Sequence, residues 1–173
     1  GGGVSVFDPA KEQFIAHYGE VHSDLDMKLP NNWLNAIHID SRGGVWLGSF
    51  GGITRINPTV DSLKQYSEED YEGLNSNTIY TITEDKSGRM LFGTDQGGSV
   101  YHTTRDSFSI LTHKDGLAHN VVKSIAITSR NDYWIGTFHG LSKYKTEEKQ
   151  FVNFYQSDGL SGNQFLNGSV FQS

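Results

Sequence analysis

The sequence predicts an all-β fold built from repeated four-stranded antiparallel sheets. Three segments share one pattern: a polar turn, an apolar run, a glycine turn and then a second strand-like run. These segments are residues 40–56, 85–100 and 128–144. The equivalent residues Trp46, Leu91 and Trp134 follow one another at intervals of about 45 residues. This period, with strand-type units, is typical of the blades of a β-propeller.

The chain begins partway through a unit. Residues 2–9 match residues 51–58 position by position, with a glycine pair before alternating apolar residues. They therefore correspond to the third strand of a blade, and the fourth strand follows. We interpret residues 1–28 as the outer strands of a preceding blade, ending in a polar connector over residues 19–28.

Three complete blades and part of another come next. We place the blades at residues 29–73, 74–116 and 117–159, and the inner strand of a following blade at residues 160–173. Four asparagines fall in register before the first strands: Asn32, Asn77, Asn120 and Asn163. A short amide side chain at such a position is expected to bond its own backbone.

The second strand of each unit is a nearly continuous apolar run, which fits a strand covered on both faces. We therefore expect Trp46 and Trp134 to be buried between neighbouring blades. No window shows a helical period, so almost no helix is expected. Two arrangements remain open, a four-bladed ring closed by the two terminal pieces or a fragment of a larger propeller, and we favour the fragment.

Composition excludes several classes of function. The chain of 173 residues has 14 Lys and Arg against 20 Asp and Glu, a net charge of -6, and no cysteine. This mild acidity argues against binding to nucleic acid or to an anionic membrane. The lack of cysteine rules out disulfides, thiolate metal sites and a cysteine nucleophile, although it does not determine the compartment.

Motifs for catalysis or cofactor binding are missing from the sequence. The glycine-rich stretch 48–52 is followed by a strand pattern, whereas a phosphate loop needs a helix at that point. Asp40 and Asp85 recur at one turn, where a carboxylate can accept backbone N–H bonds, so we interpret them as structural. The histidines are scattered. We expect no catalytic residues, no metal and no cofactor.

Binding residues are better predicted from propeller geometry. The loop between the second and third strands and the loop before the first strand emerge on one face. These loops carry aromatic and planar polar side chains, which suit the apolar faces and hydroxyl edges of sugar rings. The candidate ligand-binding residues are Trp33, Phe50, Asp95, Gln96, His119, Phe138 and His139.

Residues 29–53 and 117–141 follow the pattern Leu-x-x-Asn-x-ψ-x-x-Ile-x-x-Asp-x-x-Gly-x-ψ-Trp-ψ-Gly-Thr-x-x-Gly-ψ, where ψ is apolar. This pattern resembles the two-component regulator propeller repeat. There are departures, because Leu91 replaces the repeat's tryptophan, Thr128 its aspartate and Asn131 its turn glycine. The resemblance extends over nearly the whole chain.

The resemblance implies a segment of a seven-bladed propeller in the periplasmic sensor region of a hybrid two-component system. In such sensors two propellers precede a β-sandwich, a membrane helix, a histidine kinase and a receiver, and many respond to oligosaccharides. We therefore expect an oligosaccharide ligand, contacts with other blades and domains, a homodimeric parent, and no enzyme activity in this segment.

Two other functions stay open. One is a propeller lyase or glycosidase, which would need converging acid and base groups; the face loops offer only Asp95, His119 and His139. The other is a scaffold for protein partners, which would show a large apolar surface patch.

Overall fold

The computed structural model describes residues 2–19 and 26–169, and it confirms the predicted all-β fold. The first sheet contains β1 (Val4–Asp8), β2 (Gln13–Gly19) and β3 (Asp26–Lys28). The second contains β4 (Leu34–Ile39), β5 (Val45–Ser49), β6 (Gly52–Ile56) and β7 (Leu63–Tyr66). The third contains β8 (Ile79–Glu84), β9 (Met90–Thr94), β10 (Gly98–His102) and β11 (Ser107–Leu111). The fourth contains β12 (Val122–Ile127), β13 (Tyr133–Thr137), β14 (Leu141–Lys145) and β15 (Gln150–Phe154).

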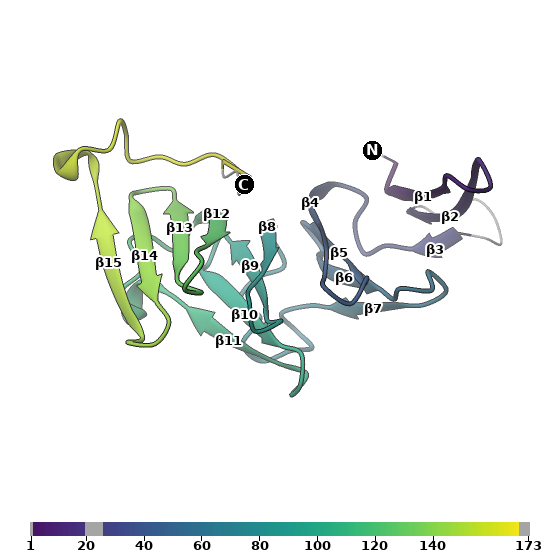
Figure 1. Cartoon of the computed structure of the whole chain (residues 1–173), viewed down its shortest axis with the longest axis horizontal. Helices are drawn as coiled ribbons and strands as arrows, with labels where there is room; N and C mark the ends of the chain where they lie inside the picture. The colour runs from purple at the N-terminus through teal and green to yellow at the C-terminus, as the bar shows by residue number, and fades with distance from the viewer. Residues whose placement is uncertain (1, 20–25, 170–173) are drawn as a thin grey trace.

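The sheets follow one another around an open arc (Figure 1). Within each four-stranded sheet the strands pair antiparallel in chain order. The first strand of a sheet packs on the inner half of the sheet before it: β8 contacts β4 and β5, and β12 contacts β8 and β9. Two 3-10 helices, η1 (His113–Asp115) and η2 (Gln156–Asp158), are the only helices among the described residues. The sheets are therefore arranged as propeller blades.

A glycine in each second strand allows the next sheet to come this close. A Cβ added to Gly93 would lie 2.7 Å from Cγ1 of Val122, at the start of the next first strand, and Gly48 is equally crowded by the third sheet. At Gly136 the ring of Phe165 takes this place, 2.9 Å from the added atom. Phe165 therefore lies where a following first strand would begin.

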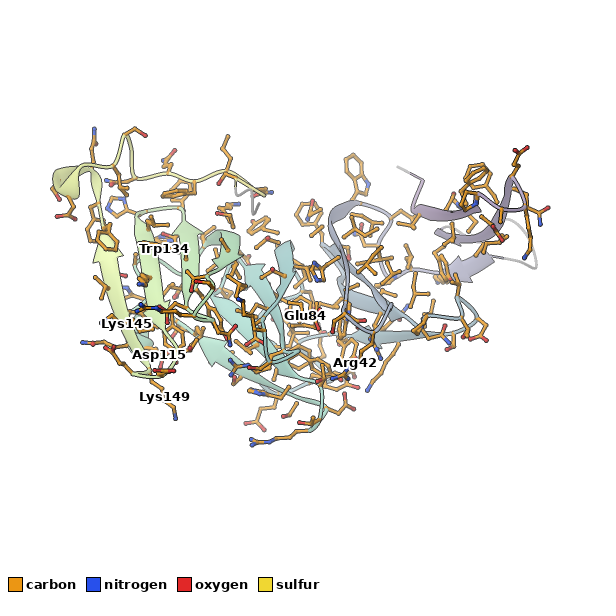
Figure 2. The ribbon with its side chains drawn as sticks, viewed as in Figure 1. Arg42, Glu84, Asp115, Trp134, Lys145 and Lys149 are labelled. Carbon is orange, nitrogen blue, oxygen red and sulfur yellow. The ribbon has the colours of Figure 1, made fainter. Side chains whose placement is uncertain are left out.

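The aromatic core confirms one buried tryptophan and corrects the other. Trp46 is fully buried, with its ring centroid 5.7 Å from that of Phe92 and 5.4 Å from that of Tyr101 in the next sheet. Trp134 occupies the corresponding place in the last sheet but is only half-buried (Figure 2). Within the described part of the chain no further sheet packs on the face of the last sheet that carries Trp134. The ring centroid of Trp134 lies 5.5 Å from that of Phe154 in the same sheet. The prediction that Trp134 is buried between blades was therefore wrong.

The incomplete first sheet leaves an apolar surface on its neighbour. Ile37 of β4 is 62% exposed, whereas the equivalent Ile82 and Ile125 are 8% and 4% exposed. These two residues are covered by the inner strands of the preceding sheet. Among the described residues the first sheet has only β1, β2 and β3. The face of β4 that carries Ile37 is therefore left uncovered.

The turn carboxylates have the structural role predicted for them. Oδ1 of Asp85 accepts the backbone N–H of Arg89 at 2.9 Å, and Asp40 makes the same bond in its own turn. In the last sheet the hydroxyl of Thr128 accepts the backbone N–H of Asp132 at 3.0 Å. Threonine thus replaces aspartate without loss of the turn bond.

The register asparagines correct one prediction. The side-chain oxygens of Asn77, Asn120 and Asn163 accept N–H groups from the connector that leaves the preceding sheet. Asn77 accepts from Glu68 at 2.9 Å, Asn120 from His113 at 2.7 Å and Asn163 from Gln156 at 2.6 Å. Each of these three asparagines therefore joins the end of one sheet to the start of the next.

The terminal segments differ in part from the expectation. The predicted connector over residues 19–28 contains the last residue of β2 and all of β3, which pairs parallel with β2. Residues 160–169 contain no strand, and residues 170–173 lie outside the described residues. The inner strand over residues 160–173 therefore stays a prediction.

Candidate functional site

All seven candidate residues lie at the same end of the sheets. The loop before each first strand and the turn after each second strand meet there, because consecutive strands are antiparallel. We call this end the loop face. The residues in its loops are 30–33 and 49–52 in the second sheet, 75–77 and 94–97 in the third, and 118–121 and 137–140 in the fourth.

A hydroxyl group fixes each turn of the loop face. In the third sheet Oγ1 of Thr94 donates to the carbonyl of Gly97 at 2.9 Å and accepts the N–H of Gln96 at 3.0 Å. Ser49 and Thr137 make the same pair of bonds in their own turns. The side chains at the turn tips are therefore presented by a rigid backbone, which lowers the entropy cost of binding.

Contacts within each sheet bring the two loops together. The side-chain amide of Asn75 donates to the carbonyl of Gln96 at 2.8 Å, and the rings of His119 and Phe138 are 5.8 Å apart. The structure therefore places His119 beside Phe138, as the geometry predicted. Their surfaces form one patch on the fourth sheet.

Three aromatic rings of the loop face are open to solvent. Trp33 is 70% exposed, Phe50 is 49% exposed and Phe138 is 48% exposed. Each belongs to a different loop, so the rings are spread along the face. Exposed rings held by rigid turns can stack on the apolar face of a sugar.

Two cavities open beside these rings. One of about 510 Å³ is lined by residues 28–33, including Trp33, and by Gly19. The other, of about 500 Å³, is lined by Lys123, Phe138 and residues 164–167. Both volumes fall within the range of small-molecule sites.

Sequence reasoning missed the charged group of the second cavity. The ammonium of Lys123 lies over the ring of Tyr80, 3.3 Å from its centroid. Burial lowers the pKa of Lys123, while the nearby charge of Asp95 acts in the opposite direction. The available signal was a lysine in a first strand whose other residues are apolar except for Ser124, VVKSIAI.

The acid and base candidates are not assembled for catalysis. Nδ1 of His119 accepts the N–H of Val121 at 3.0 Å, and the ring of His139 lies 5.8 Å from that of Tyr155. Among the described residues no hydrogen bond joins Asp95, His119 or His139 to one another, and no cluster suited to a metal ion is found.

Comparison with known proteins identifies the repeat. The two-component regulator propeller repeat matches residues 28–51, 73–96 and 116–139. In these three segments the chain is similar to the two-component regulator propeller family. Each matched segment runs from the loop before the first strand to the turn after the second, so the propeller repeats contain the parts that build the loop face.

Proteins similar to this chain include a histidine kinase and extracellular domains of hybrid two-component systems. The chain is 28% identical over 146 residues to histidine kinase P4 of Formosa agariphila, covering 82% of this chain and 11% of that protein. The structure of the present chain is similar to the extracellular domain of a hybrid two-component system of B. thetaiotaomicron, with a TM-score of 0.84 and 27% identity. The match covers 99% of this chain and 23% of that domain's chain. A second such domain from this bacterium has a TM-score of 0.68 and 20% identity, covering 90% of this chain and 22% of that one, and supports the fold alone.

The chain thus spans less than a quarter of the length of each of these relatives. No helix within residues 2–19 and 26–169 is long and apolar enough to cross a bilayer.

Proposed function

We propose that the chain is a propeller segment of the periplasmic sensor region of a hybrid two-component system, and that its loop face binds an oligosaccharide. The observation that carries this proposal is the set of exposed rings Trp33, Phe50 and Phe138 on one face of a fold shared with the extracellular domain of such a system. The segment itself has a binding role, and kinase activity belongs to a longer parent protein.

The chemistry of the loop face suits sugars. A pyranose ring has an apolar C–H face and a polar edge, and an exposed aromatic ring covers the first while amide and carboxylate groups bond the second. His119 lies beside Phe138 in the fourth sheet, and the loop-face turn of the third sheet contributes Asp95 and Gln96. An extended oligosaccharide can contact several blades at once.

Binding would reach a kinase by changing how the propellers pack or pair. A ligand shifts such an equilibrium only through a difference in its affinity for the two arrangements. A sugar that contacts several blades has that difference, because its contacts depend on the distances between blades. The parent would act as a homodimer, with the propellers outside the inner membrane.

Isothermal titration calorimetry with a broad oligosaccharide panel tests the proposal. The panel includes neutral glucans, mannans, xylans and galactans together with acidic oligomers. Trp33→Ala and Phe138→Ala each remove one exposed ring and are expected to weaken binding about tenfold, because an aromatic contact contributes about 0.5–1.5 kcal/mol beyond its buried area. Phe14→Ala is the matched control, since Phe14 is 71% exposed and lies in the β1–β2 hairpin.

The outcomes separate the proposal from its competitors. Binding that is weakened by both loop-face variants and not by Phe14→Ala supports it. Lack of heat with every oligosaccharide would contradict it, and release of shortened or unsaturated products would assign the chain to the propeller lyases or glycosidases instead.

A further inference from the structure

The second cavity combines one cation with aromatic and amide groups. Lys123 supplies the charge, Phe138 and Phe165 supply the rings, and Gln164 and Asn167 supply the amides. None of the described residues that line this cavity is acidic. The segment that carries Phe165 passes over the ends of β12 and β13 (Figure 1), and Gly168 donates its N–H to the carbonyl of Lys123 at 3.1 Å.

Lys123 has no ionic partner within the part of the chain that the structure describes. Six other lysines and arginines form ion pairs with side-chain carboxylates there; they are Lys11, Arg55, Lys64, Arg89, Lys143 and Lys145. Lys123 instead lies against the ring of Tyr80, with Asp95 near enough to act on its charge but not to pair with it. A half-buried ammonium without a partner favours an incoming anion.

The fold does not require a lysine at this position. Three residues after the register asparagine the second sheet has Asn35, whose side chain donates to the carbonyl of Ile79 at 3.0 Å and so joins two sheets. The third sheet has Tyr80 at this position. Since an amide, a phenol and an ammonium all occur here, packing does not explain the lysine of the fourth sheet.

A second polar atom of this region also lacks a partner. Oδ1 of Asp95 is buried and accepts no hydrogen bond from the described residues. Such an atom is satisfied when a hydroxyl group donates to it.

We propose that this cavity is a subsite for an anionic sugar, with the ammonium of Lys123 paired to a carboxylate or sulfate ester and the sugar ring stacked on Phe138. The inference rests on the proposed oligosaccharide function and specifies its ligand. A lysine is a compact point charge and accepts either anion, so the shared chemistry is a single negative group on a pyranose ring.

Calorimetry with paired probes tests the subsite. Tetrasaccharides of galacturonate, mannuronate and glucuronate are each compared with their carboxyl-reduced, neutral counterparts, and sulfated galactan tetrasaccharides with their desulfated forms. The anionic member of at least one pair is expected to bind about tenfold more tightly, because a hydrogen bond between two charged groups is stronger than one between neutral groups.

Three lysine variants locate the effect. Lys123→Gln is expected to remove the preference for the anion, and Lys123→Arg is expected to retain most of it. Lys149→Gln makes the same charge change at the far end of the fourth sheet, on the β14–β15 turn (Figure 2), and is expected to leave binding unchanged. Thermal unfolding by circular dichroism checks that all three variants are folded.

Each result decides one question. A preference for uronates or for sulfated sugars that Lys123→Gln abolishes supports the subsite and identifies the anion. Equal binding of charged and neutral partners, or a preference that survives Lys123→Gln, overturns the subsite and leaves the oligosaccharide function standing. If no probe and no neutral oligosaccharide binds, the proposed function falls together with the subsite.

Discussion

Replacing Trp46 by alanine removes the largest side chain that joins two neighbouring sheets. Trp46 is fully buried, it packs on Phe92 and Tyr101 of the next sheet, and its indole N–H donates to Oδ2 of Asp40 at 2.8 Å. The guanidinium of Arg55 lies 5.3 Å from the ring centroid on the remaining side. The residue thus combines apolar burial, a buried hydrogen bond and a cation–π contact.

The expected loss of stability is large because both sheets lose packing. A buried tryptophan replaced by alanine costs about 3–5 kcal/mol. For a chain of this length each kcal/mol lowers the melting temperature by about 2–4 °C, so the expected decrease is about 6–20 °C. Trp134→Ala is the matched comparison: because Trp134 is only half-buried, its removal is expected to cost about 1–2 kcal/mol.

Thermal unfolding followed by far-ultraviolet circular dichroism measures both variants without relying on tryptophan fluorescence. Trp46→Phe separates the contributions, since it keeps a ring and loses the N–H donor to Asp40. Its cost is expected to be about 1–2 kcal/mol. Equal melting temperatures for Trp46→Ala and Trp134→Ala would refute the reasoning that inter-sheet burial at Trp46 stabilises the fold.

Two further predictions concern contacts between sheets. Gly93→Ala would place a methyl group 2.7 Å from Cγ1 of Val122, so it is expected to lower the free energy of unfolding by about 1–3 kcal/mol, measured by thermal unfolding. Gly162→Ala is the control, because the space around Gly162 is open. Equal melting temperatures for the two variants would contradict the prediction. Burial opposes ionisation of Asp85, but hydrogen bonds from Arg89 and Tyr133 lower its pKa overall, so its contribution to stability is complete above about pH 4 and is lost as the pH falls towards the lower folded value. The difference in melting temperature between wild type and Asp85→Asn should therefore shrink on acidification, and a constant difference from pH 7 to pH 3 would contradict this.

The fold was predictable because the repeat makes each local signal appear three times. The departures from the repeat also follow a rule that is visible in sequence. Asn131 takes the position of a turn glycine at a φ of 65°, close to the 74° of Gly88, and asparagine tolerates this left-handed conformation. A single copy of this pattern would have left the turn and the register ambiguous.

Properties that depend on a neighbouring sheet were not predictable from the repeat alone. Trp46 and Trp134 have the same place in the pattern, yet among the described residues a following sheet packs on Trp46 and none packs on Trp134. The hydroxyl of Tyr133 donates to Asp85 of the preceding sheet at 2.8 Å, a bond that joins residues 48 positions apart. A contact of this kind depends on which sheet packs against which neighbour, and the local sequence around either residue does not give that information.

The candidate site was predictable as a surface and not as a pocket. The position of Phe138 followed from the turn after the second strand. Lys123 was overlooked because a lysine in a strand normally points to solvent, and its place beside Tyr80 depends on the packing of two first strands. The contribution of residues 164–167 to the cavity likewise depends on how the segment after the last sheet lies against β12.

Backbone amide NMR spectra recorded during titration with the tightest-binding oligosaccharide show whether recognition takes place on the loop face. Chemical-shift changes are expected in residues 31–33, 49–52, 95–97, 119–121 and 137–140, with the hairpin turns at the opposite end of the sheets unchanged. Changes confined to those hairpin turns, at residues 57–62, 103–106 and 146–149, would contradict it.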